Sequence, residues 1–219
     1  MSLEFKKRII TSIFLLTLLF FMFSYSFVLI ISSIVIGLIS WIEFYALISK
    51  IFKNNDAKNR ILRFLYKSIS LLYLSGLVFF VITAKLISIS LFSVLIYSLL
   101  VAIMSDIGGL VIGKIFKGRK LSKISPNKTI SGSLGSFLFS LVLIPFFSDY
   151  FINYNILIII LFTAIISLAS QLGDLLISLL KRKAKVKDTS DLLPGHGGIL
   201  DRIDGIIFAI PAGLLIFSI

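Results

Sequence analysis

The charge of this chain is concentrated in one segment, residues 181–205, within an otherwise apolar sequence. The segment KRKAKVKDTSDLLPGHGGILDRIDG holds six basic residues, four aspartates and the only histidine. Lysine and arginine side chains donate charge-assisted hydrogen bonds to phosphate oxygens. Carboxylates bind hard cations such as Mg²⁺, which also binds substrate phosphates. The combination predicts a site for a metal ion and a polyphosphate.

Three aspartates, one just before this segment and two at its end, border apolar stretches of the chain. Asp174 lies seven residues before Lys181, which is roughly 10 Å along a helix. Asp201 and Asp204 open the last apolar segment with a spacing that places both on one helix face. A bare carboxylate in hydrocarbon costs about 2.5–3.5 kcal/mol on insertion scales. Carboxylates that converge stay ionised together if a cation lies between them, and Mg²⁺ suits such a site.

A simpler explanation is that each aspartate pairs with a nearby lysine or arginine, or caps a helix. That explanation suits the loop residues Asp188 and Asp191 better than Asp174, Asp201 and Asp204. The sequence alone leaves both explanations open.

Two basic, glycine-containing loops could bind phosphate. In PGHGG, glycine removes the side-chain obstruction, so that backbone N–H groups can approach an anion. Around it, Lys181, Arg182, Lys187 and Arg202 offer charged donors. The second loop, residues 113–135, offers Ser125, Lys128 and Thr129 as a second phosphate clamp. The alternatives are a flexible turn for the first loop and an ordinary basic membrane-flanking loop for the second.

The elements that must position these residues are predicted to be membrane-spanning helices. The chain has 219 residues, 58% of them apolar, a mean hydropathy of +1.09 and 15% charged residues, against about 25% charged residues in soluble domains. We predict an all-α, polytopic integral membrane helical bundle of about seven transmembrane helices. The predicted spans are 9–23, 27–48, 69–84, 87–113, 132–148, 152–178 and 204–219.

The distribution of charge predicts the orientation and excludes other classes. If Lys6, Lys7 and Arg8 are cytoplasmic, every one of the 22 basic residues except Lys85 falls on the cytoplasmic side. We therefore predict a multi-pass protein of the cell (inner) membrane with a cytoplasmic N-terminus and cytoplasmic active-site loops. The net charge of +12 is explained in the same way, which argues against a nucleic-acid partner. The chain has no cysteine, which excludes disulfides, thiolate metal sites and cysteine nucleophiles.

The segment from Ser178 to Asp204 resembles the signature of the phosphatidate cytidylyltransferases, also called CDP-diacylglycerol synthases. The resemblance is carried by SLLKR, KDTS and LPGHGGILDRID, and upstream by SDIGG and SPNKT. In the SPNKT loop, Asn127 and Ser131 stand where the family usually has lysine and glutamate. The resemblance begins near Asp106; earlier residues match only by hydropathy and the short WIEFY segment. We therefore divide the chain into N-terminal transmembrane helices, 1–85, and a catalytic transmembrane region, 86–219, that carries the signature (178–204).

The resemblance implies an integral membrane enzyme of phospholipid biosynthesis that joins CTP to phosphatidate, giving CDP-diacylglycerol and pyrophosphate. It implies Mg²⁺, with K⁺ as a second ion, and Asp174 and Asp201 as metal ligands. The expected partners are CTP, phosphatidate and the lipid bilayer. Association of two chains into a homodimer is left as an open alternative. The expected catalytic residues are Asp174, Asp201, Asp204, Lys181, Arg182 and His196. The expected substrate-binding residues are Ser125, Lys128, Thr129, Ser178, Lys187, Asp188, Gly197, Gly198 and Arg202.

The chemistry itself needs no general base, because a phosphate monoester is largely a dianion near neutral pH. We therefore favour a hydrogen bond from His196 to a phosphate or to the pyrophosphate over a structural or an acid–base role.

Two alternatives to a phosphatidate cytidylyltransferase remain. One is a CTP-dependent transferase or kinase acting on another membrane lipid, such as a polyprenol or ether lipid. The other is an ion-coupled transporter, because intramembrane aspartates also line ion paths.

Overall fold

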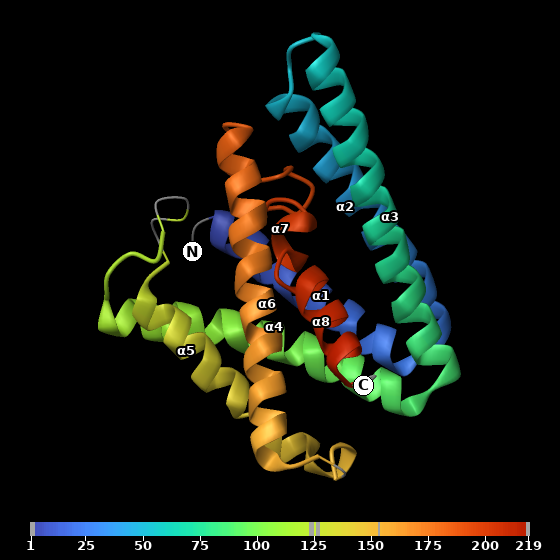
Figure 1. The fold of residues 1–219 in the computed structure, drawn as a ribbon, viewed down its shortest axis with the longest axis vertical. Coiled ribbons are helices and arrows are strands. Elements are labelled where there is room, and N and C mark those ends of the chain that lie inside the picture. The colour runs from blue at the N-terminus through green and yellow to red at the C-terminus, as the bar shows by residue number, and fades with distance from the viewer. Residues whose placement is uncertain (1–2, 123–124, 126–127, 153, 218–219) are drawn as a thin grey trace. The chain divides into compact units, whose positions relative to one another are not determined.

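The described residues form helices joined by loops, which confirms the all-α prediction (Figure 1). The computed structural model describes residues 3–122, 125, 128–152 and 154–217. The elements are α1 (Leu3–Ser24), α2 (Ser26–Ile51), α3 (Ala57–Ile87), α4 (Ile89–Phe116), α5 (Ile130–Leu141), the 3₁₀ helix η1 (Ile144–Tyr150), α6 (Ile156–Lys183), α7 (Leu200–Ile203) and α8 (Ile206–Phe217).

Among the described residues, five or six helices could cross a membrane by their length and composition, against about seven predicted. Five helices, α1, α2, α3, α4 and α6, are long and apolar enough to cross a membrane. A sixth crossing exists if α5 and η1 are one span, although they are bent by 42°. The bend falls where Pro145 enters η1, and proline cannot continue a helical hydrogen-bond ladder. The last predicted span contains α8, whose 12 residues reach only about 18 Å.

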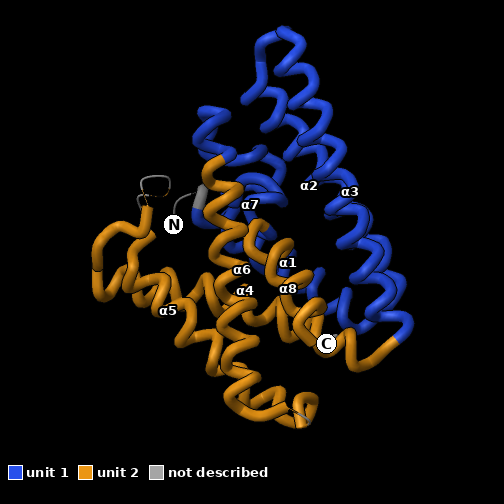
Figure 2. The backbone as a smooth tube through the Cα atoms, viewed as in Figure 1, with its two compact units in different colours: residues 1–87, 180–203 blue, residues 88–179, 204–219 orange. Residues whose placement is uncertain are grey.

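The contacts within the chain define two compact units, coloured separately in Figure 2. The first unit comprises residues 1–87 and 180–203. The loop of the signature between α6 and α7, residues 184–199 (the signature loop), therefore groups with the N-terminal helices. The second comprises residues 88–179 and 204–219. The functional division at residues 85 and 86 stays a prediction.

In the first unit, α2 and α3 run side by side and α1 packs against α2 (Figure 1). The Trp41 indole N–H donates to the carbonyl of Lys67 at 3.2 Å, and the Lys67 ammonium lies 3.2 Å from the centroid of the Tyr45 ring. At the other end, Lys85 donates to the carbonyl of Phe23 at 3.0 Å. These bonds tie together helices that otherwise present apolar side chains outward, as lipid-facing helices do.

In the second unit, α4 and α5 pack closely through small residues. A Cβ atom on Gly135 would lie 2.7 Å from the Gly108 carbonyl oxygen, so the two backbones touch. Buried hydroxyls then join the helices. Ser136 donates to the Ser105 carbonyl at 2.7 Å, and Ser167 of α6 donates to the Ser105 hydroxyl at 3.1 Å. Small and hydroxylated residues are the usual means by which membrane helices approach and bond.

Candidate active site

Asp174, in the second unit, forms an ion pair with Lys128. One carboxylate oxygen of Asp174 pairs with the Lys128 ammonium, and the other accepts a 3.2 Å hydrogen bond from the Ser178 hydroxyl. The side chains of Asp174 and Lys128 are 22% and 29% exposed. Asp174 is therefore partly exposed, and the sequence-predicted residues Lys128, Asp174 and Ser178 do lie together.

The loop that carries Lys128 is held by the start of α5. Thr129 caps this helix, because its hydroxyl accepts a 3.0 Å hydrogen bond from the amide of Gly132. Ser131 accepts from the amide of Gly118 at 3.2 Å and contacts the Thr129 hydroxyl at 3.0 Å. The Ser125 carbonyl accepts from the Lys128 amide at 3.1 Å. Thr129 and Ser125 thus shape the loop that presents Lys128, and Asn127 lies outside the described residues.

The backbone of Asp204 packs against α6 immediately beside Asp174. A Cβ atom on Gly173 would lie 2.6 Å from the Asp204 carbonyl oxygen and 2.5 Å from the Phe208 ring, so only glycine fits there. The Asp204 side chain is buried, and one carboxylate oxygen accepts the amide of Gly205 at 2.9 Å. Asp174 and Asp204 therefore belong to one neighbourhood of the second unit.

Asp201, in the first unit, pairs with Lys181 and anchors the signature loop. The Lys181 ammonium lies 2.6 Å from Asp201 Oδ1, with the carboxylate 4% exposed. Oδ2 accepts the Thr189 amide at 2.8 Å and the Gly198 amide at 3.0 Å, and it also lies 2.9 Å from the Thr189 hydroxyl. One oxygen of Asp201 thus faces a cation, and the other holds the loop.

These contacts keep Asp201 ionised at neutral pH. Burial on its own raises the pKa of Asp201, but the hydrogen bonds from Lys181 and from the Thr189 and Gly198 amides outweigh it, so the pKa lies below its ordinary value. A carboxyl with a lowered folded-state pKa stabilises the fold above the ordinary aspartate range. That contribution is lost only as the pH falls through the lowered pKa.

The glycines of the PGHGG turn are required by geometry. Gly195 and Gly197 have φ values of 76° and 81°, a backbone region that favours glycine. A Cβ on Gly197 would lie 2.9 Å from Asp201 Oδ2 and 3.2 Å from Asp188 Cβ. The turn is closed by the Leu193 amide, which donates to the Gly197 carbonyl at 2.8 Å. The predicted residues Asp188, Gly197 and Gly198 therefore lie around Asp201.

His196 links the turn to α1. Its Nε2 lies 3.3 Å from the Ser12 hydroxyl, and its backbone carbonyl accepts the Arg202 guanidinium, with Arg202 Nε at 2.9 Å. The buried Nδ1 of His196 has no hydrogen-bond partner among the described residues. Arg202 thus braces the turn through its contact with His196, whereas His196 retains an unused ring nitrogen.

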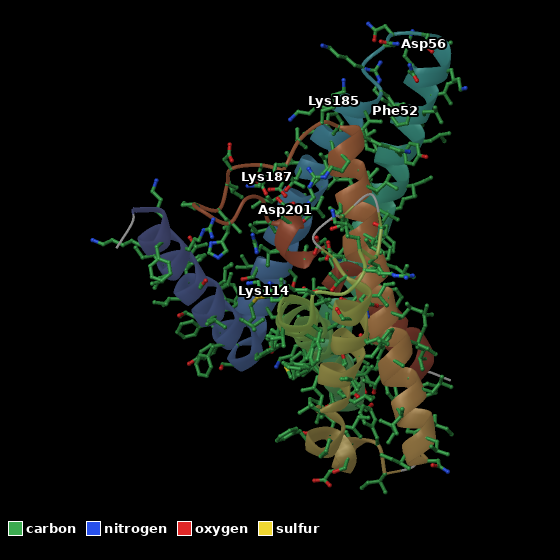
Figure 3. All side chains as sticks on the ribbon, turned by 90° about the vertical axis from the view of Figure 1, so that its left-hand side faces the viewer. Phe52, Asp56, Lys114, Lys185, Lys187 and Asp201 are labelled. Carbon is green, nitrogen blue, oxygen red and sulfur yellow. The ribbon has the colours of Figure 1, made fainter. Side chains whose placement is uncertain are left out.

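Two predicted phosphate donors lie apart from these networks. Arg182, at the end of α6, and Lys187, in the following loop, are exposed, and within the described ranges neither side chain makes a hydrogen bond or ion pair. Figure 3 marks Lys187 and Lys185 on the loop that precedes Asp201. Both predicted donors are thus accessible to a ligand from solvent.

Glu43 is a site residue that the sequence analysis missed. It lies in α2, is 4% exposed, and its carboxylate accepts hydrogen bonds from Thr189, Ser190, Ile199 and Leu200. All four donors belong to the signature loop or to the start of α7. The sequence did hold one indication of its role, because Glu43 is a single carboxylate within an apolar span. Such a residue usually belongs to a functional site and has a polar or charged partner side chain or backbone group.

The pairing of both aspartates with lysines is the arrangement that the simpler explanation predicted. It is also compatible with a metal ion. Asp174 and Asp201 each direct one hard oxygen at a cation, Lys128 or Lys181, which a metal ion could replace. Among the described residues, no three acidic or histidine side chains form a metal cluster by themselves. Magnesium is commonly held by one or two carboxylates with water and substrate phosphates, and each of these carboxylates, taken by itself, is a suitable ligand of that kind.

Comparison with known families decides what kind of protein carries this site. The Cytidylyltransferase family matches residues 3–219. The chain belongs to this family. The match extends over both units, so the cytidylyltransferase resemblance of residues 178–204 is part of a relationship that covers nearly the whole chain.

Curated relatives of this cytidylyltransferase match about half of it. A phosphatidate cytidylyltransferase of Staphylococcus haemolyticus (strain JCSC1435) is 44% identical over 121 residues, 53% of this chain and 46% of the relative. The phosphatidate cytidylyltransferase of Staphylococcus aureus (strain COL) is 44% identical over 120 residues, and that of Staphylococcus epidermidis is 41% identical over 120 residues, with the same coverage. The matched region of this chain thus spans about half the length of these relatives.

Proposed function

We propose that this cytidylyltransferase transfers a cytidylyl group from CTP to phosphatidate, giving CDP-diacylglycerol and pyrophosphate in phospholipid biosynthesis. The observation that carries the proposal is that Asp174, just before the family signature, and Asp201, within it, each direct one oxygen at a lysine ammonium. The phosphatidate cytidylyltransferases named above support the choice of reaction. The apolar helices support a multi-pass membrane protein, as a lipid substrate requires.

We propose that Asp174 and Asp201 are the metal ligands. Mg²⁺ bound there would neutralise charge on the phosphates, and K⁺ remains our expectation for a second ion. In this proposal Lys128 and Lys181 leave the two carboxylates and bind phosphate oxygens as point charges. Asp204, packed beside Asp174, would support the site from behind.

The reaction requires positioning and charge neutralisation rather than a base. A phosphate oxygen of phosphatidate forms a bond to the α-phosphorus of CTP, and the bond from that phosphorus to the bridging oxygen of pyrophosphate breaks. The attacking phosphate is already largely a dianion, so it loses no proton in the step. Arg182 and Lys187 would hold phosphates, and His196 would offer its free ring nitrogen to one of them. The amides of His196, Gly197 and Gly198 already donate to Leu193 and Asp201, so they hold the turn.

The orientation follows from where the two substrates are found. CTP is soluble, whereas phosphatidate keeps its acyl chains in the bilayer and its head group at the surface. We propose that the protein lies in the cell membrane with its N-terminus and both basic loops on the cytoplasmic side, as the basic residues predict.

Labelled CTP distinguishes the proposed reaction from its alternatives. With purified protein in liposomes that contain phosphatidate, we expect label from [α-³²P]CTP in the lipid fraction and label from [γ-³²P]CTP in pyrophosphate. A CTP-dependent lipid kinase would instead move the γ-label into the lipid. Liposomes that carry a polyprenyl phosphate or an ether-lipid phosphate in place of phosphatidate test the substrate. No lipid label with any of them, together with ion uptake, would contradict the proposal and favour a transporter.

A further inference from the structure

Glu43 is buried in a membrane-spanning helix without a charged partner. Its side chain lies in α2, and within the described part of the chain it makes no ion pair. A buried carboxylate is costly unless hydrogen bonds compensate for the lost hydration. The compensation here comes from four neutral donors, all in residues 189–200.

The donors are divided evenly between the two carboxylate oxygens. Glu43 Oε1 accepts the Ser190 hydroxyl at 2.6 Å and the Ile199 amide at 3.1 Å. Glu43 Oε2 accepts the Thr189 hydroxyl at 2.9 Å and the Leu200 amide at 2.8 Å. Each oxygen therefore holds both ends of the loop, the Thr189–Ser190 end and the end that leads into α7. This double anchor leaves the loop little freedom relative to α2.

Thr189 connects Glu43 to Asp201. The Thr189 hydroxyl lies 2.9 Å from Glu43 Oε2 and 2.9 Å from Asp201 Oδ2, and the Thr189 amide donates to the same Asp201 oxygen at 2.8 Å. A hydroxyl has one proton to donate, so it serves one carboxylate at a time. The positions of the two carboxylates are consequently coupled through one side chain.

Gly198 shows how closely α2 approaches the loop. A Cβ atom there would lie 2.5 Å and 2.6 Å from the two carboxylate oxygens of Glu43. The Gly198 amide also donates to Asp201 Oδ2. The Glu43 carboxylate is thus enclosed by the same backbone that holds Asp201.

We propose that Glu43 is a positioning residue for the cytidylyltransferase reaction, which acts through Thr189 to hold Asp201 and the glycine turn in their working arrangement. In this role Glu43 would act through the loop residues that it contacts and not by touching substrate or metal. The effect on turnover rests on the proposed function, whereas the anchoring of the loop does not.

The experiment combines hydrogen–deuterium exchange with kinetics on Glu43→Gln in nanodiscs. A glutamine keeps one acceptor oxygen but presents an N–H₂ group to two of the four donors. We expect the amides of residues 199 and 200 to exchange at least about 10-fold faster, and kcat to fall about 10–100-fold, with the KM for CTP changed less than about threefold. Asp56→Asn is the matched control, because Asp56 is exposed in the turn before α3, and it should change neither quantity.

Thr189 provides a second pair of variants if Glu43→Gln does not fold. Thr189→Val keeps the shape of the side chain but removes the shared hydroxyl, and should reproduce the loss of turnover. Thr189→Ser keeps the hydroxyl and should retain most of the activity. Combining Thr189→Val with Glu43→Gln should cost little more than either change alone, because both break the same connection.

The outcomes separate the two proposals. Unchanged exchange at residues 199 and 200 in Glu43→Gln would overturn the anchoring, and faster exchange with unchanged kcat would overturn the positioning role. Equal activity of Thr189→Val and Thr189→Ser would also overturn it. A wild-type protein that makes no CDP-lipid would refute the proposed function instead, and the exchange measurement would still decide whether Glu43 anchors the loop.

Discussion

Replacing Asp201 with asparagine should lower the rate of CDP-diacylglycerol formation at least about 100-fold, or about 2.7 kcal/mol of transition-state stabilisation. The reason is that the two oxygens of Asp201 have different partners, Lys181 on one and the Thr189 and Gly198 donors on the other. An amide group must direct its N–H₂ either at the Lys181 ammonium or at the loop donors. In both orientations the negative charge that would hold a metal ion is lost.

The measurement is the initial rate with labelled CTP in phosphatidate liposomes, for wild type and Asp201→Asn at several Mg²⁺ concentrations. Asp191→Asn is the control, because Asp191 is exposed in the same loop and loses the same charge. It should retain the wild-type rate. An Asp201→Asn protein that folds and works within threefold of wild type would show that Asp201 only anchors the loop or is dispensable.

Gly198→Ala should abolish most of the activity while the membrane helices remain folded. The added methyl group would collide with the Thr189 hydroxyl and would lie 2.5 Å and 2.6 Å from the Glu43 oxygens. These atoms belong to buried, hydrogen-bonded groups and cannot move away without breaking bonds to Asp201. We expect a loss of at least about 100-fold, which corresponds to about 2.7 kcal/mol in the barrier.

Gly76→Ala is the control for this substitution, because a Cβ on Gly76 of α3 meets nothing within 4 Å. Its activity should equal that of wild type. Circular dichroism of both variants in detergent should show unchanged helix content. A Gly198→Ala enzyme with near-normal turnover would mean that the Glu43, Thr189 and Asp201 contacts are not needed in their observed arrangement.

The all-helical fold could be predicted from the sequence because hydropathy reports directly on the environment of a helix. Span lengths were less predictable. The segment from residue 132 to residue 148 has the apolar composition of one helix, but it bends by 42° where Pro145 enters η1. The segment from residue 204 was predicted as one span, and the structure shows the 12-residue helix α8 after a break at Asp204 and Gly205 that separates it from α7.

The residues of the candidate site were predictable where charge stood out against an apolar background. Lys128, Asp174, Lys181 and Asp201 were named on that ground, and the ion pairs between them are contacts that periodicity cannot specify. Phosphate binding by Thr129 stays a prediction, and its hydroxyl also caps α5, as threonines before helices commonly do. Glu43 lies 146 residues from its partner Thr189, so only the folded chain could bring the two together.

The most direct test of the account is the metal dependence of the reaction. Purified protein in phosphatidate liposomes should convert [α-³²P]CTP to labelled CDP-diacylglycerol with Mg²⁺, stop when EDTA is added, and resume when Mg²⁺ is restored. Turnover at the full rate in EDTA, or in the double variant Asp174→Asn and Asp201→Asn, would contradict the proposal that these carboxylates hold a catalytic cation.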